Sequence, residues 1–138
     1  YCYLFDIYPT LCEMTGVPVP EGVDGRSLKD VVTGSQNTAR DYIFLSYINI
    51  QRAVKKDGVK LVMYNVDGQR RIQLFDLVRD PLEIDNLADA PAYKDKLEEL
   101  SALLGQAMRE SGDICDPDKP AWGYPARLTY SEILEINL

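Results

Sequence analysis

A group of acidic residues near the middle of the chain is the first candidate for chemistry. Asp76, Asp80, Glu83 and Asp85 follow one another closely, and carboxylates at short spacing can bind Ca²⁺. Their spacing lacks the alternating ligands and the central glycine of an EF-hand loop. An Asp-Pro pair such as Asp80-Pro81 instead commonly starts a turn in which the carboxylate binds its own backbone. We therefore predict turn formation for this group and assign no metal ligand.

The chain contains no complete nucleophilic centre. Cys2, Cys12 and Cys115 are widely spaced with no Cys-x-x-Cys pair, which favours small buried side chains over a disulfide framework or a zinc site. Ser27 lies in the string G-R-S-L at 25–28, but the chain has no histidine that could act as its base. The hydroxyl is better explained as a helix cap. No catalytic residue is predicted in this chain.

Arg52, with its neighbour Gln51, is the candidate for ligand binding. A guanidinium that extends from a strand can hold an anionic group through two parallel hydrogen bonds. The alternative is an ion pair between Arg52 and a nearby carboxylate, in a chain with 22 acidic residues. We assign Gln51 and Arg52 as candidate substrate-binding residues and keep the ion pair as the competing interpretation.

The segment 42–87 predicts the sheet that positions these residues. Runs of β-branched and aromatic residues occur at 42–49, 51–54, 59–64 and 72–77, and Asp-Gly pairs follow Lys56 and Val66. Asp and Gly tolerate the positive φ of tight turns, so these pairs favour hairpins. The prediction is an antiparallel meander of about four strands. Apolar residues occur on both faces, so one face should pack on a helix and the other should be partly covered.

A helix that could cover the sheet follows it in the sequence. It should start at Asp89 or at the Ala90-Pro91 pair and run to about Arg109, with leucines recurring at helical spacing. Ser111-Gly112 should end it. The predicted fold class is therefore α+β, with a four-stranded antiparallel sheet and one long C-terminal helix packed on it.

Short helices are predicted before the sheet. Residues 6–16 suit a helix that Asp6 caps and Gly16 closes in a left-handed conformation. A Pro- and Gly-rich connection over 17–25 leads to one or two further helical turns that end at Gly34. The first helix has an apolar stripe that consists of Ile7, Leu11 and Met14.

The tail from residue 113 is predicted to be irregular in its first half because it is rich in Pro and Gly. Trp122 and Tyr124 should anchor it to the body of the protein, and ring stacking in a sugar-binding cleft is the alternative. The last segment, 131–138, suits a short helix or an edge strand.

Composition limits the classes of function. The chain of 138 residues is 46% hydrophobic and 27% charged, as in one ordinary globular domain. Its formal net charge of -7 argues against a nucleic-acid partner, which would require a basic surface. No apolar run approaches the roughly 20 residues that span a bilayer, so no membrane partner is expected. The chain begins at Tyr1 without a methionine or a targeting signal, and we expect a fragment of a longer protein.

Two passages of the sequence resemble the C-terminal part of the sulfatase family, within the alkaline-phosphatase-like superfamily. The first has D-I-Y-P-T-L at 6–11, G at 16, G-R-S-L at 25–28 and G at 34. The second has R-A-V at 52–54, K-L-V at 60–62, L-F-D-L at 74–77, D-P-L-E at 80–83 and N-L-A at 86–88. The strings occur in the family's order and at similar spacing, and together they cover most of residues 6–104.

The resemblance implies three segments. Residues 1–34 would be the end of the catalytic α/β domain with its connection, residues 35–112 a small C-terminal subdomain of sheet and helix, and residues 113–138 a tail that matches nothing we can name. The subdomain borders the substrate cleft in related sulfatases, which is the setting in which Arg52 would meet an anionic substrate. A periplasmic or extracellular location is also implied by the resemblance alone.

The family's chemistry requires groups that this chain lacks. Sulfatases use a formylglycine made from the Cys or Ser of a Cys/Ser-x-Pro/Ala-x-Arg motif, together with Ca²⁺ held by Asp and Asn or Gln. No such motif occurs here, and the chain has no histidine. Without nucleophile and metal, covalent attack and charge neutralisation are both lost. We therefore expect no cofactor in this segment, and no activity from the segment alone.

The resulting hypothesis is the C-terminal fragment of a sulfuric ester hydrolase, with a structural role and a role at the substrate cleft. Its partners would be the catalytic domain of the parent chain and a sulfated carbohydrate or aryl sulfate. Two alternatives remain open: a non-catalytic binding module, or a fragment of a related phosphodiesterase or phosphonate hydrolase.

Overall fold

The computed structural model describes residues 1–66, 68–116, 118–119 and 122. The chain divides into two compact units, residues 1–43 and 44–138, and each is described by itself. The predicted segment boundary after residue 34 concerns the domains of a longer protein and stays a prediction. Arg40 lies beyond that predicted boundary, and its guanidinium donates hydrogen bonds to the carboxylate of Asp6, so both residues belong to the first unit of this chain.

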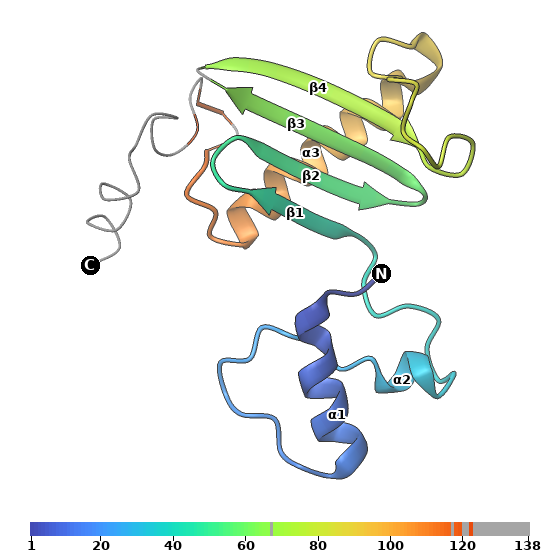
Figure 1. The fold of residues 1–138 in the computed structure, drawn as a ribbon, viewed down its shortest axis with the longest axis vertical. Helices are drawn as coiled ribbons and strands as arrows, with labels where there is room; N and C mark the ends of the chain where they lie inside the picture. The colour runs from blue at the N-terminus through green and yellow to red at the C-terminus, as the bar shows by residue number, and fades with distance from the viewer. Residues whose placement is uncertain (67, 117, 120–121, 123–138) are drawn as a thin grey trace. The chain divides into compact units, whose positions relative to one another are not determined.

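The second unit is built on a four-stranded antiparallel sheet in the order β1-β2-β3-β4 (Figure 1). The strands are β1 (Ile43–Tyr47), β2 (Gln51–Lys56), β3 (Val59–Val66) and β4 (Gln69–Asp76). Asp57 and Gly58 both have positive φ, as the tight turn between β2 and β3 requires. The predicted meander and the α+β fold class are confirmed.

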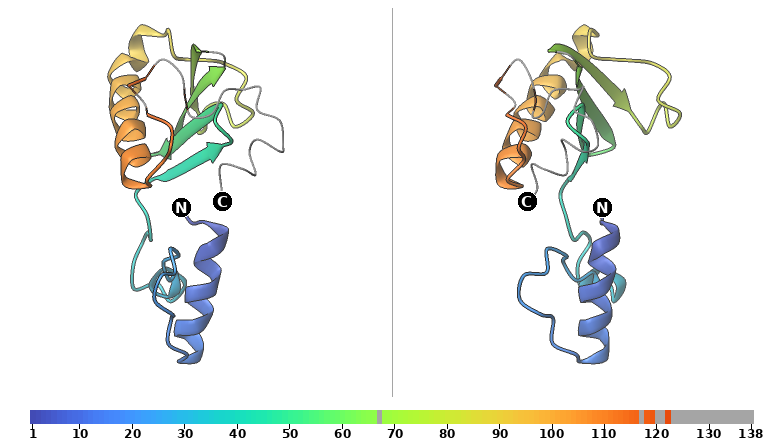
Figure 2. Two further views of the ribbon diagram at one scale, coloured as in Figure 1. Left: turned by 90° about the vertical axis from the view of Figure 1, so that its left-hand side faces the viewer. Right: turned by 60° about the vertical axis from the view of Figure 1, so that its left-hand side comes forward.

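The long helix α3 (Lys94–Glu110) lies across one face of this sheet (Figure 2). It follows the short η2 (Pro91–Tyr93) and ends where Gly112 adopts a left-handed φ of 67°. Lys56 of β2 pairs with Glu99 of α3, and the Tyr93 hydroxyl donates to Asp76 of β4. The face that carries Lys56 and Asp76 is therefore the covered one. The core side chains that are at most 1% exposed include Val54, Leu61, Leu74, Leu100, Leu104 and Met108.

The opposite face of the sheet has a smaller apolar centre. Ala53, Val62 and Phe75 are buried there, with Tyr64 and Leu77 packed at the margin. On the same face, Lys60 forms an ion pair with Glu83 of the segment after β4. Apolar residues on both faces were expected, and each face has its own buried group.

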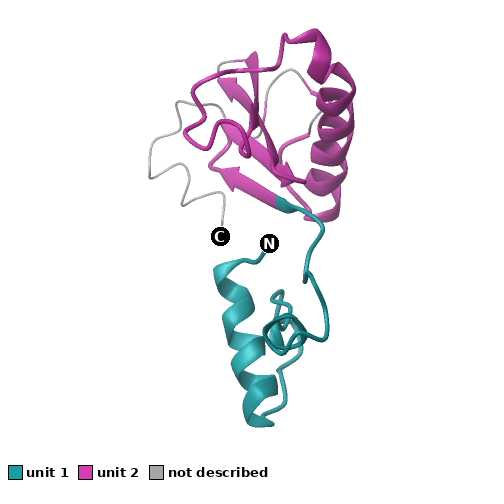
Figure 3. Ribbon diagram, turned by 90° about the vertical axis from the view of Figure 1, so that its right-hand side faces the viewer, with its two compact units in different colours: residues 1–43 teal, residues 44–138 magenta. Residues whose placement is uncertain are grey.

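The first unit contains η1 (Leu4–Asp6), α1 (Ile7–Thr15) and α2 (Lys29–Val32) (Figure 3). Gly16 closes α1 with a φ of 74°, as predicted. The predicted cap at the other end is wrong, because the Asp6 carboxylate makes no hydrogen bond to the first turn of α1. It accepts hydrogen bonds from the backbone N–H of Tyr3 and of Arg26 instead.

Asp6, which directly precedes α1, and Thr10 of α1 bind the backbone of the connection between α1 and α2. Asp6 accepts the N–H of Arg26 at 2.8 Å, and the Thr10 hydroxyl accepts the N–H of Leu28 at 2.8 Å. A Cβ at Gly25 would lie 2.4 Å from the carbonyl oxygen of Phe5, so only glycine allows this approach. These bonds give a physical reason for the strings D-I-Y-P-T-L and G-R-S-L at their spacing.

The apolar stripe of α1 is not buried within the described residues. Ile7, Leu11 and Met14 are 48–56% exposed, and Leu4 is 84% exposed. The side of α1 that packs within the unit is the one with Thr10 and Cys12. In the part of the chain that the structure describes, no helix is long and apolar enough to cross a membrane.

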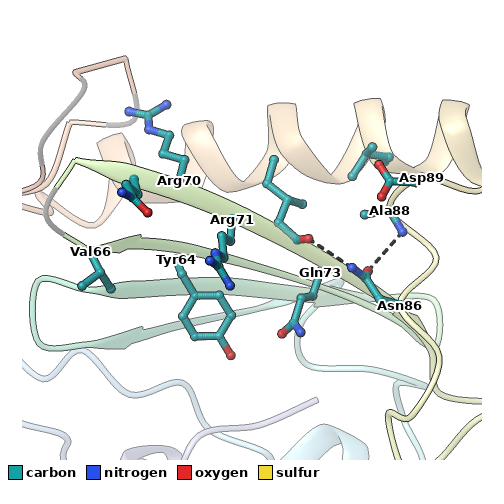
Figure 4. Close-up of a pocket in the computed structure, with 11 residues that line it drawn as sticks. Tyr64, Val66, Arg70, Arg71, Gln73, Asn86, Ala88 and Asp89 are labelled. Carbon is teal, nitrogen blue, oxygen red and sulfur yellow. Dashed lines mark hydrogen bonds between the residues drawn. The ribbon is translucent and has the colours of Figure 1, made fainter.

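Asn86 covers the outer edge of β4. Its side-chain oxygen accepts the N–H of Leu74 at 2.9 Å. The same oxygen accepts the N–H of Ala88 at 3.1 Å, and the side-chain amide donates to the carbonyl of Ile72 at 3.4 Å (Figure 4). The N–H of Leu87 donates to the carbonyl of Leu74. Asn86 therefore pins the crossing from sheet to helix through bonds to the backbone.

Substituting Asn86→Ala should lower the free energy of unfolding by about 1 kcal/mol, because the partly buried N–H of Leu74 loses its acceptor. Urea unfolding should show a lower midpoint with an unchanged slope. The neighbouring exposed Asp85→Ala serves as the control and should stay within about 0.5 kcal/mol. Equal losses in the two variants would contradict this role for Asn86.

Candidate functional site

The two predicted binding residues lie on opposite faces of the sheet. Side chains alternate along a strand, so neighbours such as Gln51 and Arg52 of β2 point in opposite directions. Arg52 is the cross-strand partner of Met63 in β3, on the face that α3 covers. Gln51 is the cross-strand partner of Tyr64, on the other face. The structure therefore separates the two candidates rather than combining them in one site.

Arg52 is 2% exposed, and every one of its N–H groups has a partner in the protein. Nε and Nη2 donate to the two carboxylate oxygens of Asp113, the second bond at 2.8 Å. Nη1 donates to the carbonyls of Ile48 and Gln51 at 2.7 and 2.8 Å, and Nη2 also donates to the Cys115 sulfur at 2.9 Å. The ion pair that the sequence left open as an alternative is thus formed, and a substrate contact by Arg52 stays a prediction.

The charges around Arg52 stabilise one another. Burial raises the pKa of the Asp113 carboxyl, but the hydrogen bonds from Arg52 outweigh this and hold the pKa below its usual value. Burial likewise opposes the charge of Arg52, and the bonds to Asp113 raise its pKa. The pKa of the Cys115 thiol is raised, chiefly by burial. The pair is therefore ionised and Cys115 is a neutral buried thiol.

Trp122 anchors the segment after α3 to the sheet. Its ring is 3% exposed and lies 5.5 Å from the guanidinium of Arg52 and 6.0 Å from that of Arg70. A cation over the face of an indole ring is attracted to the ring electrons. Arg70 also donates a hydrogen bond to the backbone carbonyl of Lys119. The anchoring interpretation of Trp122 is confirmed, while Tyr124 and the predicted element at 131–138 lie outside the described residues.

Gln51 belongs to a row of polar residues on the uncovered face. It pairs with Tyr64 of β3, and Tyr64 pairs with Arg71 of β4, so the three side chains lie side by side. Gln73 lies two residues further along β4 on the same face. Figure 4 shows Tyr64, Arg71 and Gln73 projecting to one side of the sheet and Arg70 to the other.

Three residues of this row, Tyr64, Arg71 and Gln73, line a surface pocket of about 1010 Å³, and Gln51 adjoins them through its pairing with Tyr64. The pocket extends around the edge of β4 to the segment that contains Asn86 and to α3. Tyr64, Arg71 and Gln73 were not predicted as site residues. The signal was available, because counting outward from the two short turns pairs Gln51 with Tyr64 and Tyr64 with Arg71.

The acidic group around Asp80 forms turns. One oxygen of Asp76 accepts the N–H groups of Val78 and Arg79, and one oxygen of Asp80 accepts those of Ile84 and Asp85. The predicted turn chemistry is therefore present. Across residues 1–66, 68–116, 118–119 and 122, no group of three or more His, Cys, Asp or Glu side chains is arranged to hold a metal ion.

Comparisons with known proteins define the class. The family model for "N-sulphoglucosamine sulphohydrolase, C-terminal" matches residues 2–110. The chain is 36% identical over 129 residues to an arylsulfatase of Clostridium perfringens, covering 88% of this chain and 26% of that protein. It therefore belongs to this family of sulfatase C-terminal domains.

Solved structures agree with this assignment. A 2-O GAG sulfatase is similar at a TM-score of 0.65 with 32% identity, over 78% of this chain and 25% of that one. The phosphonate monoester hydrolase of Agrobacterium radiobacter is similar at a TM-score of 0.57 with 23% identity, over 77% and 24%, which shows a shared fold. The chain spans about a quarter of the length of these relatives.

Proposed function

We propose that this chain is the C-terminal part of a sulfuric ester hydrolase whose reacting groups lie elsewhere in the parent protein. The observation that carries the proposal is the family match over residues 2–110 in a sequence without histidine and without a Cys/Ser-x-Pro/Ala-x-Arg motif. A formylglycine nucleophile and Ca²⁺ would then be supplied by the remaining three quarters of the protein.

The first unit would pack against the catalytic domain. Its exposed apolar residues, among them Leu4, Ile7, Leu11 and Met14, form a surface that water solvates poorly. Apolar area of this kind contributes about 25 cal/mol per Å² when it is removed from water. Docking on the preceding part of the parent chain explains why α1 has an apolar stripe that its own unit leaves exposed.

The second unit would contribute a rigid wall to the substrate cleft. The substrate class is a sulfated carbohydrate or an aryl sulfate, in line with the names of the sulfatases that the chain resembles. The paired strands and α3 hold side chains on the uncovered face in fixed positions, which suits recognition by preorganised groups.

An assay of the chain and of its parent tests the proposal. The 138-residue chain should show no turnover of an aryl sulfate above background, while the parent should hydrolyse a sulfate ester and show formylglycine by mass spectrometry. Turnover by the chain alone would contradict the proposal. A parent without formylglycine that cleaves phosphonate or phosphate diesters would favour the phosphonate hydrolase alternative, and a chain encoded without the upstream motif would favour a stand-alone module.

A further inference from the structure

The strands of the sheet are rich in basic residues within an acidic chain. Strands β1 to β4 contain six of the chain's 15 basic residues but only one of its 22 acidic residues, Asp76. Asp76 lies on the face that α3 covers, where it accepts the hydroxyl of Tyr93. No strand therefore places a carboxylate on the uncovered face, and the basic residues that pairing and alternation place there are Lys55, Lys60 and Arg71.

Arg71 is the cation of this face that is best placed for a ligand. Lys60 is engaged by Glu83. Arg71 is exposed, and among the described residues it forms no ion pair. A guanidinium presents a planar fork of donors that matches the oxygens of sulfate or carboxylate. The side chain is thus suited to an anionic group that enters the pocket.

Tyr64 provides a flat apolar surface next to this cation. Its ring packs on the buried cluster of Ala53, Val62 and Phe75, which limits its movement. It lies directly between Gln51 and Arg71 in the cross-strand row. An aromatic ring supplies contact area at low cost in conformational entropy, and its edge stays polar through the hydroxyl.

Two carboxamides complete the arrangement. Gln51 lies on one side of Tyr64, and Gln73 lies next to Arg71 along β4 and projects to the same side (Figure 4). A carboxamide offers both donors and an acceptor, the combination that hydroxyl groups of a sugar require. Tyr64, Arg71 and Gln73 line the pocket of about 1010 Å³ together with Asp89, and Gln51 is the cross-strand neighbour of Tyr64. A few polar groups around an apolar surface are the usual composition of a small-molecule site.

We infer that Gln51, Tyr64, Arg71 and Gln73 form a binding site for a sulfated sugar unit. The sugar ring packs on Tyr64, its sulfate is held by Arg71, and its hydroxyls bond to Gln51 and Gln73. The choice of a sulfated ligand rests on the proposed function, whereas the site itself rests on the register of the strands and the charge of the face. A docked protein segment is the competing occupant, and protection of the row in the parent protein distinguishes it from a sugar.

Binding to the chain can be measured without turnover. Backbone amide shifts in NMR are followed while a hexuronate–hexosamine disaccharide with one sulfate is added, with the unsulfated disaccharide and inorganic sulfate as separate arms. The sulfated sugar should shift the amides of Gln51, Tyr64, Arg71 and Gln73 and should bind about tenfold more tightly than either control. Its affinity should fall as salt is raised.

Arg71→Gln is expected to weaken binding of the sulfated disaccharide about tenfold, and Tyr64→Leu should weaken the sulfated and unsulfated sugars alike. Arg70→Gln is the control for charge. Arg70 also lines the pocket, but its side chain projects to the other face, where the carbonyl of Lys119 and the ring of Trp122 engage it, so its loss should change affinity less than twofold. Equal losses from Arg70→Gln and Arg71→Gln would overturn the site, since they would indicate general attraction of anions.

Other outcomes separate this inference from the proposed function. No amide shifts at about 10 mM disaccharide, or shifts confined to other surfaces, would overturn the site and leave the sulfatase assignment of the parent untouched. A parent without formylglycine, combined with specific binding at this row, would overturn the proposed reaction and leave the site standing. Protection of the row in the parent by its own preceding chain, with no sugar binding, would identify it as a docking surface.

Discussion

Replacing Arg52 with methionine should lower the free energy of unfolding of the second unit by about 3–5 kcal/mol. The Arg52 side chain is 3% exposed and that of Asp113 is 6% exposed, so removal of the guanidinium leaves a buried carboxylate without its partner. Losing one member of a buried pair costs this much because the other charge keeps its desolvation penalty. Methionine preserves most of the volume, which confines the effect to charge and hydrogen bonds.

The single tryptophan of the chain reports on this variant. Trp122 is buried 5.5 Å from Arg52, so its fluorescence should shift toward that of a solvated indole when the segment after α3 is released. Far-UV circular dichroism follows the sheet and α3 in the same urea titration. Arg79→Met is the control, because that side chain is 80% exposed, and it should change stability by less than about 0.5 kcal/mol.

A double variant distinguishes charge from packing. Removing both partners, with Arg52→Met and Asp113→Leu, should restore much of the lost stability, because no buried charge then remains unpaired. A double variant that is as unstable as the sum of the single changes would contradict the account. It would show that Asp113 and Arg52 act independently.

The second large effect concerns Asp6 and pH. Burial raises the pKa of this carboxyl, but the bonds from Arg40, Tyr3 and Arg26 outweigh it and lower the pKa from 3.8 to about 2. A carboxyl with a depressed folded pKa stabilises the protein above its unfolded pKa and loses that contribution as pH falls through the folded value. The first unit should therefore lose about 2 kcal/mol between about pH 4 and pH 2.

Hydrogen exchange measures this effect directly. The N–H groups of Tyr3 and Arg26 are bonded to Asp6, so their protection reports the opening of the first unit. Asp6→Asn should remove the pH dependence below pH 4 and lower the opening free energy at pH 7 by about 2–3 kcal/mol, because Arg40 loses a charged partner. Asp30→Asn, at an exposed position in the same unit, is the control. A wild-type chain with unchanged protection down to pH 2 would contradict the role of Asp6.

The sheet and the long helix could be predicted because their signals are local. Asp57-Gly58 and Gly68 mark the turns, and Leu100 and Leu104 mark the buried side of α3. Once the turns are placed, the register follows by counting, and with it the row that joins Gln51 to Tyr64 and Arg71. The row could have been found from the sequence by taking this step.

The partners of charged residues could not be predicted in the same way. Arg52 meets Asp113 across 61 positions, and Asp6 meets Arg40 across 34 positions. No periodicity relates residues so far apart, and local rules favoured a different outcome for Asp6, namely a helix cap. The partly buried bonds from Arg26 and Arg40 replace that cap, and they satisfy several donors at once.

The short turns on both sides of β3 leave no spare residue that could absorb a change in length. Deleting one residue from β2 would exchange inside and outside along the strand, placing the guanidinium of Arg52 in solvent and the carboxamide of Gln51 against the core. These strands can therefore accept substitutions but not insertions or deletions. Insertions and deletions are easier to accept in the longer connection from residue 77 to residue 90, where additional residues before Asn86 leave the pairing of the strands unchanged.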